Sequence, residues 1–485
     1  MCSSLYKKLF LLQFILAVIL RLFFFFADYH EVWWDSGVYI GMGKYLFSGG
    51  QVGLWEDIRP VLWPLVLGFG WRIGFDPDFF GRIITFGLSL GCIFLLYLIA
   101  KRVFDEYTAL VAVTIFAFSP IFFSLGFHTY TEIPSLFLLL LSILLLFKER
   151  IFLAGFVLGL STLTRFPMGI FIIPFCVFLF FSKKIGSHLS SFLSAFVLSL
   201  TPFFVFNYVL YGNILTPFLA GSAAIKQVLG CNVLRYNAGS AYLYWLVFAE
   251  HPLHVFALIG IAAQVRRWFV REQLFLFSCV VIPLLYYSSL QCRDYRYLLS
   301  FLPFVVLFTA QGITFVLERV TETCSVFHKK HVFIAIFIFV LGTSLWQGLL
   351  YYQGNENVQK DSVALDYFSH LRNKNISGEL WTANPLTAAY TDKYFEKIYY
   401  PVYHQQQYKI FFDYLQNSTH RVGAVLLDNC GGGILCHPDD VVCKNKTEEA
   451  LFFLTKNFEI VYNKTNGLCY YVIFTRQNST VSKAN

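Results

Sequence analysis

The chain has 485 residues, of which 57% are hydrophobic and only 14% are charged. So small a charged fraction excludes a water-soluble globular protein, because such proteins carry about 25% charged residues. A net charge of +8 by itself favours a nucleic-acid partner, but the basic residues lie in short clusters between apolar runs and form no single patch or stripe. We therefore expect an integral membrane protein that is embedded in the lipid bilayer and does not bind nucleic acid.

The basic clusters predict how the chain is oriented in the membrane. They alternate with loops that lack such clusters, which is typical of cytoplasmic loops rich in Lys and Arg. The N-terminus is therefore expected in the cytoplasm, and residues 9–26 are expected to be a retained first span because no small-residue cleavage site follows them. The clusters are Lys7 and Lys8, Lys101 and Arg102, residues 148–150, Lys183 and Lys184, residues 266–271, and Lys329 and Lys330.

Apolar runs recur along the first three quarters of the chain, and we expect about eleven membrane spans. After the first span, an outer loop over residues 28–76 is rich in Trp, Gly and acids and is expected to form short interfacial helices. Pro167 predicts a helix break over residues 164–167 that is buried in protein and does not face lipid. The other expected spans are 80–100, 110–127, 133–147, 151–163, 167–181, 189–208, 242–263, 274–290, 297–316 and 332–351.

The odd number of spans places the tail on the side opposite the N-terminus. Alternating apolar residues over 422–427 and 470–474 predict strands, and residues 447–456 predict a helix. The predicted fold is an all-α polytopic membrane domain over residues 1–352, followed by a small extracytoplasmic α/β domain over residues 353–485.

Two features of the tail agree with that location. Asn-x-Ser/Thr acceptor sites for N-glycosylation, which are usable only on the translocated side, occur at Asn375, Asn417, Asn445, Asn463 and Asn478. Four cysteines, an even number suited to two disulfides, lie at Cys430, Cys436, Cys443 and Cys469. Their pairing is left open. A zinc site is the alternative, but no Cys-x-x-Cys and no nearby pair of histidines supports it.

Charged residues near membrane depth are costly and are functional candidates by default. Arginine presents a planar fork that matches phosphate oxygens, and it stays charged as a leaving phosphate gains charge. A carboxylate can remove the proton from an incoming hydroxyl. Acids opposite several arginines therefore predict transfer from a phosphate-linked donor. The outer-side candidates are Asp35, Glu56, Asp57, Arg59, His128, Glu132, Arg165, Arg293, Asp294 and Arg296.

The acidic candidates also have structural interpretations. Asp35 can be the N-cap of a helix that begins directly after it. Glu132 can mark a helix start, because acids favour the first turn and Pro134 fits there. His128 fits a polar residue at an interface, and we assign it no role.

The arginines have structural interpretations as well. Arg165 can pair with a carbonyl or carboxylate inside the broken span, and Arg59 can be an interfacial anchor. Arg293 and Arg296 can be outer-loop charges balanced by Asp294. At a helix start, however, their spacing of three places them on one face, which suits a phosphate.

Five segments, taken in order, resemble the C-type membrane glycosyltransferases, and within them the branch of the dolichyl-phosphate-mannose protein mannosyltransferases and aminoarabinose transferases. The resemblance extends over about residues 1 to 350, and the order and loop placement of the segments match. The segments are Asp35-Ser36-Gly37-Val38-Tyr39, residues 58–65, Thr131-Glu132-Ile133-Pro134, residues 153–167 and residues 293–299.

This resemblance implies transfer of a sugar, with inversion, from a polyprenyl-phosphate carrier on the outer face. It also implies an aspartate of the first outer loop as general base, which corresponds to Asp35. Family members often carry a second acid directly after that aspartate, whereas Ser36 stands here. Glu56 or Asp57 can substitute for that acid in binding an acceptor or a metal.

We therefore predict a glycosyltransferase that moves a sugar from a polyprenyl-phosphate donor to a hydroxyl acceptor. Asp35 and Glu132 are the expected catalytic residues, and Arg59, Arg165, Arg293 and Arg296 are expected to bind the donor phosphate. The alternatives are a transporter or flippase of a lipid-linked carrier and a silent scaffold. The sequence leaves open the sugar, the acceptor (protein, lipid or glycan), the need for a divalent metal, and whether the membrane is a cell membrane or endoplasmic reticulum.

Overall fold

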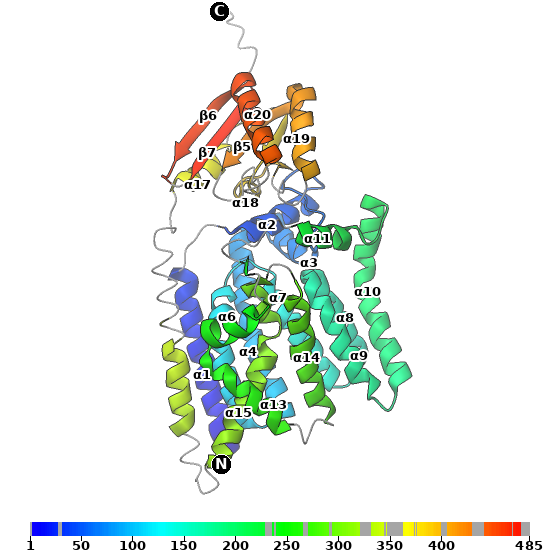
Figure 1. Ribbon diagram of the computed structural model, residues 1–485, viewed down its shortest axis with the longest axis vertical. Coiled ribbons are helices and arrows are strands. Elements are labelled where there is room, and N and C mark those ends of the chain that lie inside the picture. The colour runs from blue at the N-terminus through cyan, green and yellow to red at the C-terminus, as the bar shows by residue number, and fades with distance from the viewer. Residues whose placement is uncertain are drawn as a thin grey trace, which may run out of the picture. The chain divides into compact units, whose positions relative to one another are not determined.

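The structure is a computed structural model, shown in Figure 1. It describes the chain except for residues 1, 28–31, 228–234, 237–238, 265–269, 291–292, 321–330, 344–345, 347–361, 373, 375, 399–404, 429–440, 468 and 477–485. The chain forms two compact units. Unit 1 contains Met1–Tyr29, Arg82–Leu215 and Cys231–Glu356, and unit 2 contains His30–Gly81, Thr216–Gly230 and Asn357–Asn485. Unit 2 thus joins the first outer loop to the tail, two segments that are expected from the sequence to belong to different domains.

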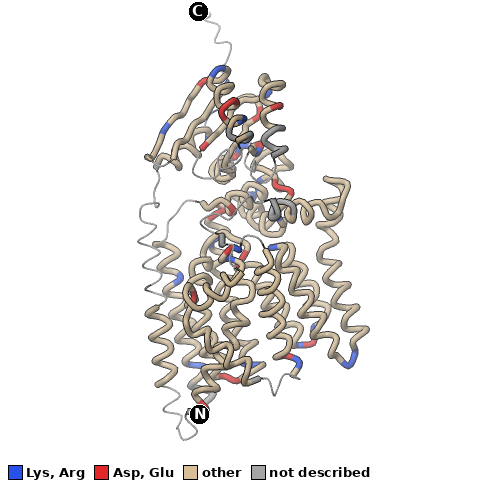
Figure 2. Tube along the Cα trace, in the orientation of Figure 1, with Lys and Arg blue, Asp and Glu red and all other residues tan. Residues whose placement is uncertain are grey.

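Unit 1 is helical, apart from a short antiparallel pair of two-residue strands. Figure 2 shows that its charged residues gather toward the ends of the helices, while the middle of most helices carries few. Its elements are α1 (Cys2–Ala27), α4 (Pro77–Val103, which begins in unit 2), α5 (Glu106–Ala117), α6 (Pro120–Leu125), α7 (Glu132–Phe147), α8 (Ile151–Thr164), η1 (Phe166–Phe171), α9 (Ile172–Phe180), α10 (Ile185–Tyr211), β1 (Arg235–Tyr236), α12 (Ala241–Tyr244), η2 (Trp245–Glu250), η3 (Pro252–Val255), α13 (Phe256–Gln264), α14 (Arg271–Ser288), β2 (Arg293–Asp294), η5 (Tyr295–Ser300) and α15 (Leu302–Val320).

Among the described residues, four helices are long and apolar enough to cross a membrane: Tyr6–Ala27, Pro77–Val103, Ile185–Tyr211 and Leu302–Arg319. Six shorter apolar helices accompany them, the last being His331–Thr343. Many of the helices are short because the chain breaks several of the expected spans. The count of about eleven spans stays a prediction.

The helix break predicted at Pro167 is confirmed. Helix α8 ends at Thr164, Arg165 is extended with φ −152° and ψ 109°, and a 3-10 turn begins at Phe166. Two further breaks were not predicted. The expected span 110–127 is interrupted between α5 and α6, before Pro120, and the expected span 242–263 is interrupted before Pro252. Both prolines act as Pro167 does, since each lacks the N–H that a continuous helix needs.

Glycines allow neighbouring helices of unit 1 to approach closely. A Cβ added to Gly260 of α13 would lie 2.0 Å from the carbonyl oxygen of Phe308 in α15, and one added to Gly312 would lie 2.0 Å from that of Phe256. Small residues at such crossings let helix backbones meet, as is common in membranes, where the hydrophobic effect does not drive helices together.

Unit 2 combines the helices of the first loop with a mixed sheet and its helices. Figure 1 labels most of these elements. They are α2 (Trp34–Phe47), α3 (Leu62–Arg72), α11 (Thr216–Gln227), α17 (Ser362–His370), β3 (Glu379–Thr382), α18 (Leu386–Tyr390), β4 (Glu396–Lys397), α19 (Gln405–Asn417), η6 (Thr419–Arg421), β5 (Val422–Asp428), α20 (Val441–Asn457), β6 (Phe458–Thr465) and β7 (Tyr470–Arg476).

The sheet has the strand order β4-β3-β5-β7-β6. Strand β3 pairs in parallel with β4 and β5, while β7 pairs antiparallel with β5 and β6. All seven residues of β5 are buried, because one core lies on each face of the sheet. Ala424 and Leu426 face the core built with α17, α18 and α2, and Val425 and Leu427 face the core built with α19 and α20. The continuous apolar run of β5 suits a strand covered on both faces. The extracytoplasmic location of this part stays a prediction.

Helix α2 packs closely on α18. A Cβ added to Gly37 would lie 3.2 Å from the Cα of Leu386, and one added to Gly41 would lie 2.7 Å from Leu54 and 3.1 Å from Ala388. The loop after α2 also joins the tail, since the Gly53 N–H donates to the Lys393 carbonyl. The first loop and the tail therefore share one hydrophobic core.

Candidate functional site

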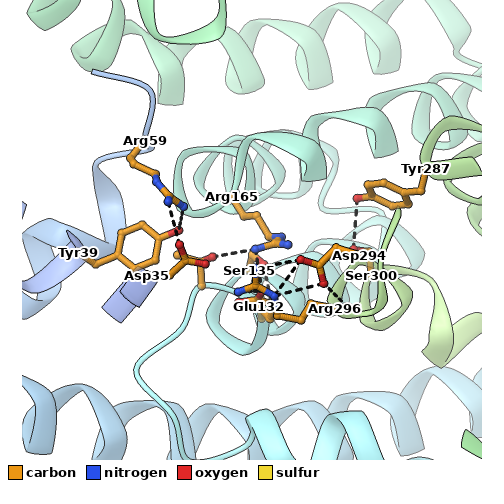
Figure 3. Close-up of polar contacts among 11 residues, drawn as sticks. Asp35, Tyr39, Arg59, Glu132, Ser135, Arg165, Tyr287, Asp294, Arg296 and Ser300 are labelled. Carbon is orange, nitrogen blue, oxygen red and sulfur yellow. Dashed lines mark hydrogen bonds and ion pairs between the residues drawn. The ribbon is translucent and has the colours of Figure 1, made fainter. Parts of the chain in front are cut away.

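Several of the predicted site residues form two clusters of ion pairs, one in each unit. In unit 2, α2 begins at Trp34, so Asp35 lies in the first turn of the helix and is not its N-cap. A carboxylate is favoured there by the helix dipole. Its Oδ1 lies 2.8 Å from Nη2 of Arg59, and the Asp35 side chain is 17% exposed (Figure 3).

Arg59 is held from three directions. Its Nε lies 3.1 Å from Oε2 of the fully buried Glu56, and its Nη1 donates to the hydroxyl of Tyr39 at 3.4 Å. The guanidinium carbon also lies 5.6 Å from the centre of the Tyr39 ring, within the range of a cation–π contact. Figure 3 shows Asp35 and Tyr39, which lie one turn apart on α2, both reaching Arg59. Arg59 therefore joins α2 to the loop that follows it.

Asp57, proposed with Glu56 as an acceptor or metal ligand, lies elsewhere. It is 42% exposed, and its Oδ1 is 3.4 Å from Nζ of Lys397. Glu56 and Asp57 thus each have a cation as a partner, which does not fit a shared metal site. Within the described ranges, no group of three or more His, Cys, Asp or Glu side chains could hold a metal ion.

The cluster in unit 1 is built around Glu132, the first residue of α7. Its buried carboxylate oxygen Oε1 lies 2.9 Å from Nη1 of Arg165 and 3.7 Å from Nη1 of Arg296 (Figure 3). Nη1 of Arg165 also donates to Oγ1 of Thr131 at 3.2 Å. Two arginines from distant segments therefore meet at one carboxylate. The break after α8 makes this possible, since it turns Arg165 out of the helix.

Arg296 is held by its own segment. The Asp294 carboxylate caps η5 by accepting the backbone N–H of Arg296 at 2.9 Å, and its Oδ2 lies 3.0 Å from Nη2 of the same residue. The guanidinium of Arg296 lies over the ring of Tyr130 at 5.3 Å, and that of Arg165 over the ring of Tyr297 at 5.1 Å. Each guanidinium thus lies within cation–π distance of an aromatic ring, a contact that helps to hold it in place.

Arg293 lies in the same segment but has another environment. Its residue belongs to β2, which pairs with β1, and its Nε donates to the carbonyl of Ser288 at 3.0 Å. Of the two arginines expected to share a helix face, Arg296 contacts Glu132, and Arg293 contacts the Ser288 carbonyl.

Sequence reasoning missed the tyrosines of both clusters. Tyr39 follows Asp35 by one helical turn, Tyr130 precedes Glu132 by two residues, and Tyr297 follows Arg296 directly. The available signal was that each of these tyrosines lies close in sequence to a charged candidate. In a chain with 29 tyrosines, such closeness is too weak a signal to identify a site residue.

The residues predicted to carry glycans and disulfides lie in unit 2. Asn417, Asn445 and Asn463 are exposed, whereas Asn375 and Asn478 lie outside the described residues. Cys469 is buried and disulfide-bonded. The side chains of Cys430, Cys436 and Cys443 lie outside the described part of the chain.

Known proteins resemble this chain in part of its sequence and in its fold. Residues 58–211 match the family described as dolichyl-phosphate-mannose-protein mannosyltransferase, and none of the curated proteins matches the chain. The structure resembles that of ArnT from Cupriavidus metallidurans bound to undecaprenyl phosphate, with a TM-score of 0.63 and 12% identity over 96% of this chain and 98% of that one.

Oligosaccharyltransferase from Archaeoglobus fulgidus is also similar. Its apo form gives a TM-score of 0.63 and 12% identity over 87% of this chain and 69% of that one. The same protein tethered with an acceptor peptide containing the NVT sequon gives 0.60 and 11%, over 98% and 74%.

At such low identity the structural likeness establishes the fold, while the activity has to be argued from the site. Together with the apolar helices, it identifies a multi-pass membrane protein. The resemblance predicted from the sequence is confirmed: the chain has the fold of the C-type membrane glycosyltransferases, of the protein mannosyltransferase and ArnT type.

Proposed function

We propose that this protein is an inverting glycosyltransferase that moves a sugar from a polyprenyl-phosphate donor to a hydroxyl acceptor on the extracytoplasmic face. The observation that carries the proposal is the meeting of Arg165 and Arg296 at the buried carboxylate of Glu132. Two guanidinium groups held in place by one carboxylate and two aromatic rings are preorganised to receive an anion. A phosphate on a lipid carrier has the charge and the oxygen geometry for this pair.

Arg165 and Arg296 are assigned to the donor phosphate, and Glu132 is assigned to orienting them. Arg59 is better explained as a partner that orients Asp35, since its guanidinium lies between two carboxylates. Arg293 contributes positive charge to the same segment as Arg296.

Asp35 is assigned the role of general base. Its carboxylate accepts the proton of the acceptor hydroxyl while the hydroxyl oxygen attacks the anomeric carbon. The bond between that carbon and the phosphate oxygen breaks, and the phosphate leaves with the electron pair and with its added negative charge facing the arginines. Attack from the face opposite the phosphate inverts the anomeric centre.

Support for a lipid-phosphate donor also comes from the similar structure of ArnT from Cupriavidus metallidurans, which is bound to undecaprenyl phosphate. We further propose that the N-terminus is cytoplasmic and the tail extracytoplasmic, as the basic clusters indicate.

The test is a transfer assay in membranes from cells that express the protein, supplied with radiolabelled dolichyl-phosphate mannose. Asp35→Asn is expected to lower transfer at least about a hundredfold, because general-base catalysis contributes about 10²–10⁴-fold. Arg296→Ala is expected to lower it mainly through weaker donor binding. Asp413→Asn is a matched control, because Asp413 is exposed on α19.

Unchanged transfer in both variants would refute the proposal. Movement of the labelled lipid across the membrane without release of dolichyl phosphate would instead indicate a flippase.

A further inference from the structure

Glu250 is a buried carboxylate to which the proposed reaction gives no role. Its residue is 1% exposed and is the last of η2. The next residue, His251, is extended with φ −157° and ψ 130° and separates η2 from η3, which begins at Pro252. Neither burial nor the C-terminal end of a helical segment favours a negative charge. A carboxylate kept at such a position needs strong compensating contacts.

Three donors provide these contacts, all from other parts of unit 1. The Ser119 hydroxyl, between α5 and α6, donates to Oε2, and the hydroxyl of Tyr295 donates to Oε1. The backbone N–H of Ile121, in the first turn of α6, lies 3.3 Å from Oε1. Both carboxylate oxygens therefore accept hydrogen bonds, and Glu250 links η2, α6 and η5.

The π-helical geometry of η2 gives Tyr295 a second contact. Residues five apart in a π-helix lie on about the same face, and such turns are frequent at functional sites. Trp245 and Glu250, the two ends of η2, accordingly both reach Tyr295. The rings of Trp245 and Tyr295 lie 5.6 Å apart in a T-shaped arrangement, while Glu250 binds the hydroxyl of the same tyrosine.

Tyr295 lies between Asp294 and Arg296, two residues of the ion-pair cluster in unit 1. Asp294 precedes it, caps η5 and pairs with Arg296, which follows it and reaches Glu132. The chain is also fixed at Asp294, whose carbonyl accepts a hydrogen bond from the Tyr242 hydroxyl at 3.2 Å. A shift of the Tyr295 side chain would therefore move the backbone that carries Arg296.

We propose that Glu250 is a positioning residue. Together with Trp245 it holds Tyr295 in place, and this fixes the position of the Arg296 guanidinium at which the donor phosphate binds. The inference rests on the proposed function and names a further residue required by the same site. Glu250 does not touch the donor in this scheme. It acts through the hydroxyl of Tyr295.

The test is equilibrium binding of dolichyl phosphate, the carrier without a sugar, to the purified full-length protein in nanodiscs. Tyr295→Phe removes only the hydroxyl, keeps the ring contact with Trp245, and is expected to weaken binding about tenfold to a hundredfold, since misplacement of a binding group by about 1 Å has effects of this size. Glu250→Gln is expected to act in the same direction. Tyr286→Phe is the matched control, because Tyr286 lies on α14 and is 38% exposed.

A double-mutant cycle separates positioning from general stabilisation. If the hydroxyl acts through Arg296, Tyr295→Phe should have little further effect on binding in an Arg296→Ala background. Additive losses in the double variant, or undiminished binding by Tyr295→Phe, would overturn the role of Glu250 while leaving the proposed function intact. Absence of dolichyl phosphate binding by the wild-type protein would overturn the proposed function, and with it this inference.

Discussion

The ammonium of Lys44 lies 2.9 Å from the carbonyl oxygen of Ala389, a residue 345 positions later in the chain. It also donates to the Thr391 carbonyl at 3.1 Å and lies 3.0 Å from Oδ1 of Asp392. Lys44 is on α2, the helix that carries Asp35, and the contacts join this helix to the end of α18. Burial lowers the pKa of Lys44, and the charge of Asp392 opposes that shift.

Replacement of this buried ammonium should destabilise unit 2. Lys44→Met leaves the Ala389 and Thr391 carbonyls without their donor, and a stranded buried acceptor costs about 1–3 kcal/mol. We expect a clear fall in the thermal unfolding temperature of the whole protein in detergent. Lys464→Met is the control, since Lys464 and Asp366 form an exposed pair, and such pairs contribute little. Equal effects of the two substitutions would contradict the importance of the Lys44 contacts.

The ion pair of Glu132 and Arg165 allows stability and activity to be separated. Arg165→Ala should destabilise unit 1, because the buried Glu132 carboxylate loses its nearer arginine and keeps Arg296 at 3.7 Å. Breaking a buried pair costs about 3–5 kcal/mol, and the remaining contact with Arg296 should make the loss smaller. Adding Glu132→Gln removes the carboxylate charge, so the double variant should recover part of the lost unfolding temperature. Transfer activity should stay low in both, since neither has the Arg165 guanidinium. Recovery of activity together with stability would show that Arg165 has only a structural role.

His370 should make unit 2 less stable in weak acid. Burial, and next the charge of Lys374, lower the pKa of His370 below its ordinary value of 6.5, with Asp366 opposing them. The unfolded chain then takes up the proton more readily than the folded chain, so stability is lost as the pH falls through 6.5 toward the lowered value. His370→Gln should reduce the difference between unfolding temperatures at pH 7.5 and pH 5. The same substitution at the exposed His420 should leave that difference unchanged.

The exposed sequons provide a test of orientation. Asn417, Asn445 and Asn463 lie on the surface of unit 2, where a glycan can be added without disturbing a core. In a eukaryotic host, the protein should migrate faster on a gel after treatment with an N-glycosidase, and each Asn→Gln substitution should remove one glycan. A chain that shows no shift with all three sequons intact would place the tail in the cytoplasm.

The sequence was most informative where a local pattern decides the structure. Hydrophobic runs predicted most of the helices, and Pro167 predicted the break that turns Arg165 out of α8. The partners of these residues could not be predicted in the same way. Arg165 lies 33 positions from Glu132, and their approach at 2.9 Å depends on how α7 and α8 pack.

Glu250 was hidden for a different reason. The surrounding apolar run predicted one continuous span over 242–263, whereas the chain forms an α-helical, a π-helical and a 3-10 segment there before α13. The amino-acid composition of a segment does not reveal a π-helix. The direction of the Glu250 side chain could therefore not be predicted, because a helical period of 3.6 residues does not hold there.

Unit 2 also sets an order of events during synthesis. Its first segment ends at Gly81, and its last begins at Asn357, so the ribosome must add the 275 residues between them. At 5–20 residues per second this takes on the order of tens of seconds. For that time α2 has not yet met Leu386 and Ala388, the neighbours that cover Gly37 and Gly41. The helix with the proposed catalytic base therefore reaches its final packing only after the ribosome has passed Ala388, and a chain terminated before that residue would leave Gly37 and Gly41 without these neighbours.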